Sequence, residues 1–105
     1  MILESPYAGN IERNILYARE CMRDCLQRGE APFASHLLYT QAGVLDDGTP
    51  DERKLGVEAG FAWNTVAEKI VVYEDLGITG GMEQGIERAK NKKIPVEYRK
   101  IKFLG

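Results

Sequence analysis

The stretch "EKIVVYEDLGITGGMEQGIERAK", residues 68–90, decides the fold of this chain. Its apolar run IVVY (70–73) is continuous, which is typical of a strand in a parallel sheet that is covered on both faces. Behind Thr79, apolar residues recur at intervals of four and three, so a helix is expected to begin there. A strand that leads through a short loop into a helix predicts an α/β fold with a parallel sheet.

The same alternation of strand and helix continues along the rest of the chain. Further strands are expected in "MIL" (1–3), "APFASHLLY" (31–39) and "KKIPVEYRKIKF" (92–103), and further helices from Ile11 to about Arg28 and from Pro50, capped by Thr49. The order β-α-β-α-β-α-β implies right-handed crossovers between parallel strands. We therefore predict a single domain over residues 1–105, a three-layer sandwich with a mostly parallel sheet of four to five strands and about three flanking helices.

Composition excludes several classes of partner. The 105 residues carry 16 acidic and 14 basic side chains, a net charge of −2 that argues against binding nucleic acid by bulk electrostatics. An apolar run of about 18 residues, which a membrane span needs, does not occur. The start "MILESPYAGN" lacks the basic flank and apolar core of a signal peptide, so a cytoplasmic location is expected.

The cysteines and the lone histidine predict neither a disulfide nor a metal site. Cys21 and Cys25 are four residues apart in a helical pattern, where their Cβ atoms are too far apart for a disulfide bond. Together with His36 they provide too few ligands for a metal ion. Buried thiols are the expected state of both cysteines.

Polar and glycine-rich segments follow three of the expected strands. They are "SPYAGN" (5–10), "SHLLYTQ" (35–41) and "EDLGITGG" (74–81). Ligands of open parallel sheets bind beyond the carboxyl ends of the strands, so these loops are expected to form a site. The candidate ligand-binding residues are Ser5, Tyr7, Gly9, Asn10, Arg13, His36, Asp75, Thr79, Gly80, Gly81 and Met82.

Two readings stay open for most of these residues. Gly80 and Gly81 expose N–H groups at a helix N-terminus, which favours an anion, but a capped helix start without a ligand has the same sequence. The Tyr7 ring can stack on a base or a sugar. His36 can be a hydrogen-bonded structural group, and Arg13 can be an ordinary surface residue.

The motifs "SPYAGNIERN", "APFASHLLYTQ" with "LDDGTPDERKLG", and "DLGITGGMEQGIERAK" with "IPVEYR" resemble those of a family of small phage and bacterial proteins. That family has the Rossmann-like fold of the nucleoside 2-deoxyribosyltransferases, and the resemblance covers nearly the whole chain. In enzymes of this superfamily, a Ser/Thr-x-Gly pattern opens a helix whose glutamate attacks the C1′ carbon of the sugar. The pattern falls here on residues 79–81, and the position of the glutamate is taken by Gly85.

The resemblance implies a nucleotide pocket that lacks its nucleophile. We therefore expect non-catalytic binding of a nucleotide or ADP-ribose-like molecule, without cofactor, metal or catalytic residue, as in a phage protein that sequesters a nucleotide immune signal of its host. The alternative is a nucleotide N-glycosidase or hydrolase whose acid is Asp47, Asp75 or Glu83. A structural role with an incidental pocket is a third possibility.

Self-association is also expected. Val57, Phe61 and Trp63 exceed the apolar surface that one helix face needs for its own core, and members of the superfamily that the chain resembles commonly pair. We therefore predict a homo-oligomer that binds neither nucleic acid nor membrane.

Overall fold

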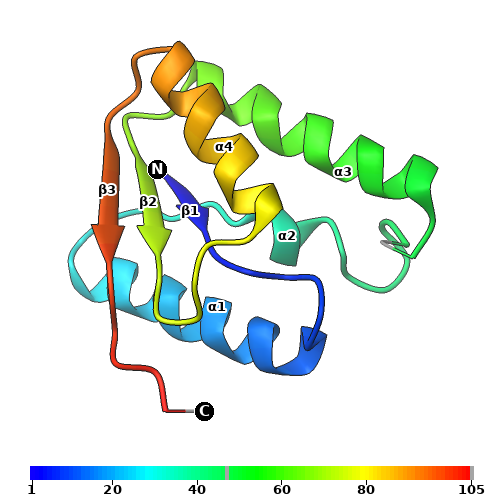
Figure 1. Ribbon diagram of the computed structural model, residues 1–105, viewed down its shortest axis with the longest axis horizontal. Helices are drawn as coiled ribbons and strands as arrows, with labels where there is room; N and C mark the ends of the chain where they lie inside the picture. The colour runs from blue at the N-terminus through cyan, green and yellow to red at the C-terminus, as the bar shows by residue number, and fades with distance from the viewer. Residues whose placement is uncertain (47, 105) are drawn as a thin grey trace.

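The sheet consists of three parallel strands in the order β1-β2-β3, as seen in a computed structural model that describes residues 1–46 and 48–104 (Figure 1). Along the chain, the elements are β1 (Ile2–Glu4), α1 (Ile11–Gln27), α2 (Ser35–Leu38), α3 (Pro50–Ala62), the 3-10 helix η1 (Trp63–Thr65), β2 (Ile70–Tyr73), α4 (Gly80–Asn91) and β3 (Val96–Arg99). The predicted α/β class with a parallel sheet is confirmed.

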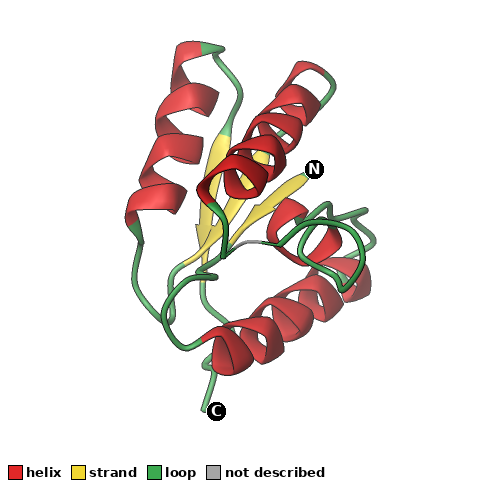
Figure 2. Cartoon of the chain, turned by 90° about the vertical axis from the view of Figure 1, so that its right-hand side faces the viewer, coloured by secondary structure: helices red, strands yellow, loops and turns green. Residues whose placement is uncertain are grey.

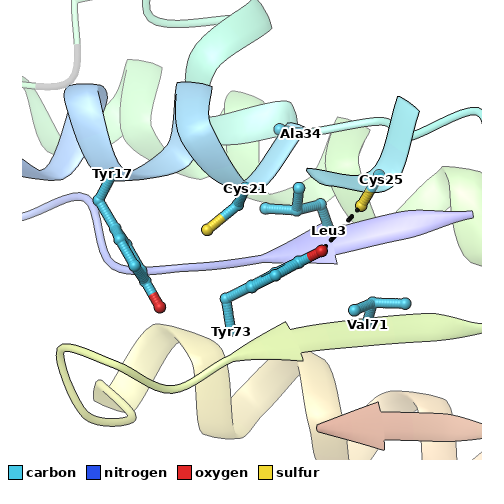
Figure 3. Packing of buried hydrophobic residues seen from close by; sticks show 7 residues of the cluster. All are labelled: Leu3, Tyr17, Cys21, Cys25, Ala34, Val71 and Tyr73. Carbon is cyan, nitrogen blue, oxygen red and sulfur yellow. Dashed lines mark hydrogen bonds between the residues drawn. The ribbon is translucent and has the colours of Figure 1, made fainter. Parts of the chain in front are cut away.

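The central strand β2 is covered on both faces, as its continuous apolar run predicts. All four of its residues are buried, and their side chains alternate between the two faces. On one face, Leu3, Val71 and Tyr73 pack against Tyr17, Cys21 and Cys25 of α1 (Figure 3). On the other face, Ile2, Ile70 and Val72 pack against Met82, Ile86 and Ala89 of α4. Figure 2 accordingly shows helices on both sides of the strands.

The two cysteines are buried free thiols, as predicted. Cys25 Sγ lies 3.2 Å from the hydroxyl oxygen of Tyr73, and Figure 3 shows this contact between α1 and β2. Burial raises the pKa of both thiols, so they remain protonated at neutral pH and serve as packing groups.

The strand expected over residues 31–39 does not form. Phe33 makes only an isolated bridge to Ile2, in which its N–H donates to Met1 O and its carbonyl accepts from the N–H of Leu3. Pro32 has no N–H to extend this pairing, and α2 begins two residues after the bridge. The last strand also ends at Arg99, because residues 100–104 leave the sheet. The described residues therefore form three strands instead of the expected four to five.

An ion-pair network holds the edge strand β3. The guanidinium of Arg99, which is only 8% exposed, donates to both carboxylate oxygens of Glu30 at 2.7 and 2.6 Å and also contacts Glu97. Lys69 joins the same carboxylate of Glu30 at 2.6 Å. These ion pairs tie the segment after α1 to β3. Hydrogen bonds from Arg99 and Lys69 also lower the pKa of Glu30 to about 2, so its carboxylate stays ionised at neutral pH.

Three helices begin at the caps that the sequence predicts. The side chain of Asn10 accepts the N–H of Arg13, Thr49 precedes Pro50 at the start of α3, and Thr79 accepts the N–H of Met82 in α4. Within the described ranges, none of the helices combines the length and apolar character that crossing a membrane requires.

Helix α3 packs against α2 rather than over the sheet (Figure 1). Gly60 is its one buried residue, and a Cβ atom at this position would lie 2.6 Å from Ser35 Oγ and 2.9 Å from Ser35 Cβ. The missing side chain lets the backbone of α3 approach α2 closely. This approach sets the position of α3, which forms one wall of the cavity described below.

Gly60→Ala tests this close approach. The added methyl group meets both the Cβ and the Oγ of Ser35, so we expect the free energy of unfolding to fall by about 1–3 kcal/mol, although alanine normally favours a helix interior. Urea unfolding followed by circular dichroism measures the change. The double variant Gly60→Ala/Ser35→Gly removes the clash and should recover most of the loss; equal stability of Gly60→Ala and wild type would contradict the packing.

Candidate functional site

A cavity of about 510 Å³ opens beyond the carboxyl end of β1, between α2, α3 and the start of α4. Parallel sheets bind their ligands at this end of the strands. Its walls comprise Ile2, Glu4, Ser5, Tyr7, Ala8, Ser35, His36, Tyr39, Thr40, Leu45, Glu52, Arg53, Gly56, Val57, Gly60, Phe61, Asn64, Thr79, Gly80, Gly81, Met82 and Gln84. The volume lies within the range of ordinary small-molecule sites.

The fold brings seven of the predicted residues together in these walls. They are Ser5, Tyr7, His36, Thr79, Gly80, Gly81 and Met82; all three polar segments contribute, and Met82 directly follows the third. Since these segments are far apart in sequence, their convergence results from the parallel order of β1 and β2 and from the position of α2.

Three other predicted residues lie away from this cavity, at the start of α1. Gly9 has a φ of 99° and borders a neighbouring hollow. Asn10 is occupied as the cap of α1, and the Arg13 guanidinium donates to the side chain of Asn14 at 3.3 Å. Asn10 and Arg13 thus organise the helix start instead of facing the cavity.

Asp75 also lies outside the cavity, because its carboxylate holds the C-terminal segment. It accepts the N–H groups of Ile101, Lys102 and Phe103 at 2.8–3.2 Å and the Tyr17 hydroxyl at 2.6 Å. Burial opposes ionisation of Asp75, but together these hydrogen bonds outweigh it and lower its pKa. In this structure Asp75 organises the C-terminal segment and does not line the cavity, unlike the seven predicted residues above.

Of the other two acids considered for catalysis, the structure describes only Glu83. Glu83 is exposed on α4 and does not line the cavity. Asp47 lies outside the described residues.

The N-terminus of α4 presents two unused donors at the cavity. As the first two helical residues, Gly80 and Gly81 have N–H groups without a partner inside the helix, and within residues 1–46 and 48–104 no acceptor contacts them. A Cβ atom at either glycine would meet nothing within 4 Å, so the space in front of these donors is open. The first turn of α4 can therefore receive an anion.

Glu4 is the carboxylic acid of this site, and it is not among the residues predicted from the sequence. Glu4 ends β1 and lines the cavity with its half-buried side chain. Its carboxyl group lies against Gly85 of α4: a Cβ atom at Gly85 would be 2.7 Å from Glu4 Oε1. Desolvation raises the pKa of Glu4 to about 8, which makes it a neutral acid at pH 7. The signal in the sequence was an acidic residue directly after an otherwise buried apolar strand.

Ser5, which follows Glu4 in the sequence, forms a hydrogen-bonded pair with His36. Ser5 Oγ lies 2.6 Å from His36 Nε2, and the ring of Tyr7 meets the imidazole edge to face with centroids 6.5 Å apart. Burial lowers the pKa of His36 to about 4, so the imidazole is neutral at pH 7. This pair ties the loop after β1 to α2 and so fixes one side of the cavity.

Asn64 adds an unsatisfied polar group to the wall. The residue is 5% exposed, and its Nδ2 atom has no acceptor in the part of the chain that the structure describes. A buried amide donor without a partner costs about 1–3 kcal/mol, and a ligand in the cavity could accept its hydrogen bond.

One family model matches nearly the whole length of the chain. A family model described as "Domain of unknown function (DUF7768)" matches residues 1–99. The chain belongs to this family. The DUF7768 match runs from before β1 through the end of β3 and includes every residue of the cavity. No curated protein and no solved structure matches the chain.

The raised pKa of Glu4 predicts a stability that falls between pH 6.5 and 8. The folded protein keeps the Glu4 proton up to about pH 8, whereas the unfolded chain releases it near 4.5, so the stabilising contribution of the neutral acid is lost as pH rises between these values. His36 acts in the opposite sense, but only from its usual pKa of 6.5 down to about 4. Glu4 therefore dominates from pH 6.5 to 8, where we expect a loss of about 2 kcal/mol.

Urea unfolding at both pH values measures this loss. Glu4→Gln, which has the shape of the neutral acid and does not titrate, should be stable to within a few tenths of a kcal/mol across the same interval. A wild-type protein as insensitive to pH as Glu4→Gln would show that Glu4 is ionised in the folded state.

Proposed function

We propose that this protein binds a phosphorylated nucleoside, a nucleotide or an ADP-ribose-like molecule, and does not cleave it. The observation that carries the proposal is the pair of unused N–H groups of Gly80 and Gly81, which open into a cavity of about 510 Å³. The positive end of the α4 dipole and two free donors favour a phosphate at this point. The rest of the cavity leaves room for the nucleoside.

Aromatic walls support the nucleoside part of the proposal. Tyr7, Tyr39 and Phe61 all line the cavity, and such rings bind the faces of bases and sugars. Phe33, a further aromatic residue nearby in the fold, does not line the cavity; its ring packs on Trp63 with centroids 4.7 Å apart. The hydroxyl groups of Tyr7 and Tyr39 supply hydrogen-bonding groups at the same walls.

The charges of the cavity are compatible with an anion. Glu52 and Arg53 in the walls carry opposite charges. Glu4 and His36 are both neutral at pH 7, because burial raises the pKa of Glu4 and lowers that of His36. The protonation of Glu4 is decisive here, because a second carboxylate would repel a phosphate in a desolvated site.

The same protonation favours binding over cleavage. Glycosidase chemistry of the superfamily that the chain resembles uses an ionised carboxylate on the helix that begins at Thr79, where this chain has Gly85. Glu4 places a carboxyl group in that space, which is the one observation in favour of an N-glycosidase. Desolvation raises the pKa of Glu4 to about 8, so the neutral form, which is not a nucleophile, is the main form at pH 7. Affinity without turnover suits sequestration of a nucleotide signal, the role we propose.

Gly80→Pro tests whether the N–H groups at the start of α4 bind the phosphate. Proline is well tolerated at the first position of a helix, and Thr79 already has the extended backbone that precedes proline, so the substitution removes one N–H with little effect on α4. We expect binding of adenosine monophosphate or ADP-ribose, measured by calorimetry, to weaken about 10- to 100-fold. Gly80→Ala keeps the N–H and should bind like wild type, because its Cβ meets nothing within 4 Å.

Chromatography of the ligand after long incubation completes this experiment. Unchanged nucleotide is expected, and release of free base by wild type but not by Glu4→Gln would establish an N-glycosidase instead. If Gly80→Pro and Gly80→Ala bound the nucleotide with equal affinity, the phosphate would not bind at the N-terminus of α4.

We also propose that the chain self-associates through α3 and η1. Leu55 and Val57 on α3, Trp63 on η1 and Val66 directly after η1 are 41–71% exposed. Sedimentation at micromolar concentration should give a mass above the 11.8 kDa of one chain. Val66→Asp should shift the mass toward the monomer, whereas Leu16→Asp, at an apolar residue of α1 that is also exposed, should not. A wild-type mass of 11.8 kDa would contradict this proposal.

A further inference from the structure

Glu4 occupies a place that only a glycine on the facing helix allows. Its carboxyl group lies where a side chain at Gly85 would project, with its two oxygens 2.7 and 3.2 Å from the Cβ position. The backbone of Glu4 is fixed by parallel pairing with β2, in register with Val72. Glu4 can therefore keep this place only as long as position 85 has no side chain.

The Glu4 carboxyl group is available to a ligand. Within the described part of the chain, it makes no hydrogen bond and no ion pair, although it lines the cavity. The side chain is half-buried, so its oxygens are open to the cavity and can exchange hydrogen bonds with a molecule bound there.

The distance between Glu4 and the N–H groups at the start of α4 sets a minimum length for a ligand that contacts both. Gly81 and Gly85 are four residues apart on α4, so they share one face and are separated by about 6 Å along the helix axis. A free phosphate cannot reach both the N–H groups at the start of α4 and the carboxyl group beside Gly85. A nucleoside phosphate spans this distance with its base or sugar toward Glu4.

We propose that Glu4 selects the base of the bound nucleotide by pairing, as a neutral carboxylic acid, with an edge that offers an acceptor beside an amino group. This inference rests on the proposed nucleotide binding. A neutral carboxyl group donates one hydrogen bond and accepts another, as the amide of glutamine does. Adenine offers the complementary pattern, whereas the N1–H and amino groups of guanine are both donors and match an ionised carboxylate.

The surroundings of Glu4 keep it in the neutral form. The titratable groups that share the cavity walls are Tyr7, His36, Tyr39, Glu52 and Arg53. From α4, the groups at the cavity are uncharged, and from β2 the residue in register is the apolar Val72. Desolvation sets the pKa of Glu4 at about 8, so the donor is present at neutral pH and lost above it.

Calorimetry of the full chain with adenosine and guanosine monophosphate at pH 7 and pH 9 tests this inference. We expect at least a tenfold preference for the adenine nucleotide at pH 7, and about a tenfold loss of its affinity at pH 9, as each unit above the pKa removes the donor from about nine-tenths of the molecules. Glu4→Gln should keep the preference and lose the pH dependence. Glu4→Ala should lose the preference.

Two further variants make the test specific. In Gly85→Ala, the added methyl group displaces the Glu4 carboxyl group. The preference for the adenine nucleotide should then decrease, and circular dichroism checks that the variant folds. Gly80→Pro should weaken both nucleotides equally and leave the preference unchanged, since it acts on the phosphate.

The outcomes separate this inference from the proposed function. Binding of both nucleotides with equal affinity, or a wild-type pH dependence that persists in Glu4→Gln, would overturn the role of Glu4 while nucleotide binding stands. Absence of binding to either nucleotide and to ADP-ribose would overturn both. The wild-type preference and its pH dependence decide the matter even if a Glu4 variant does not fold.

Discussion

Burial of β2 on both faces is the constraint on which the rest of the structure depends. Four consecutive apolar side chains can leave water only if one helix covers each face of the strand, and α1 and α4 do so. The loop between β2 and α4 then has to turn the chain back along the sheet, which brings the first turn of α4 to the carboxyl end of β1. The cavity is a consequence of this return, and α2 and α3 close it on the remaining sides.

Much of this arrangement could be predicted from the sequence, because local signals and long-range packing agree. The helix caps at Asn10, Thr49 and Thr79 and the apolar run of β2 were sufficient for the elements around them. In residues 31–39 the signals conflict, because an apolar composition suggests a strand while Pro32 and the helical α2 prevent the sheet from growing. Composition alone could not decide which of these effects is stronger.

The site was predictable only where the chemistry is local. Thr79 to Gly81 form a helix start whatever surrounds them, so their role could be derived from spacing. Glu4 is the last residue of β1 and Asp75 lies two residues after β2, and their positions near strand ends do not show which of the two acids lines the cavity. Asp75 meets the N–H groups of a C-terminal segment and becomes structural, whereas Glu4 meets a glycine and an open cavity. The difference between them is tertiary.

Gly85 and Glu4 form one structural unit. A side chain at position 85 would displace the carboxyl group of Glu4, so the acid keeps its place only beside a glycine. Position 85 is buried on α4, and the Glu4 carboxyl group in front of it is desolvated, which keeps it neutral at pH 7. In the function we propose, a neutral acid in the cavity wall is suited to exchange hydrogen bonds with a bound ligand.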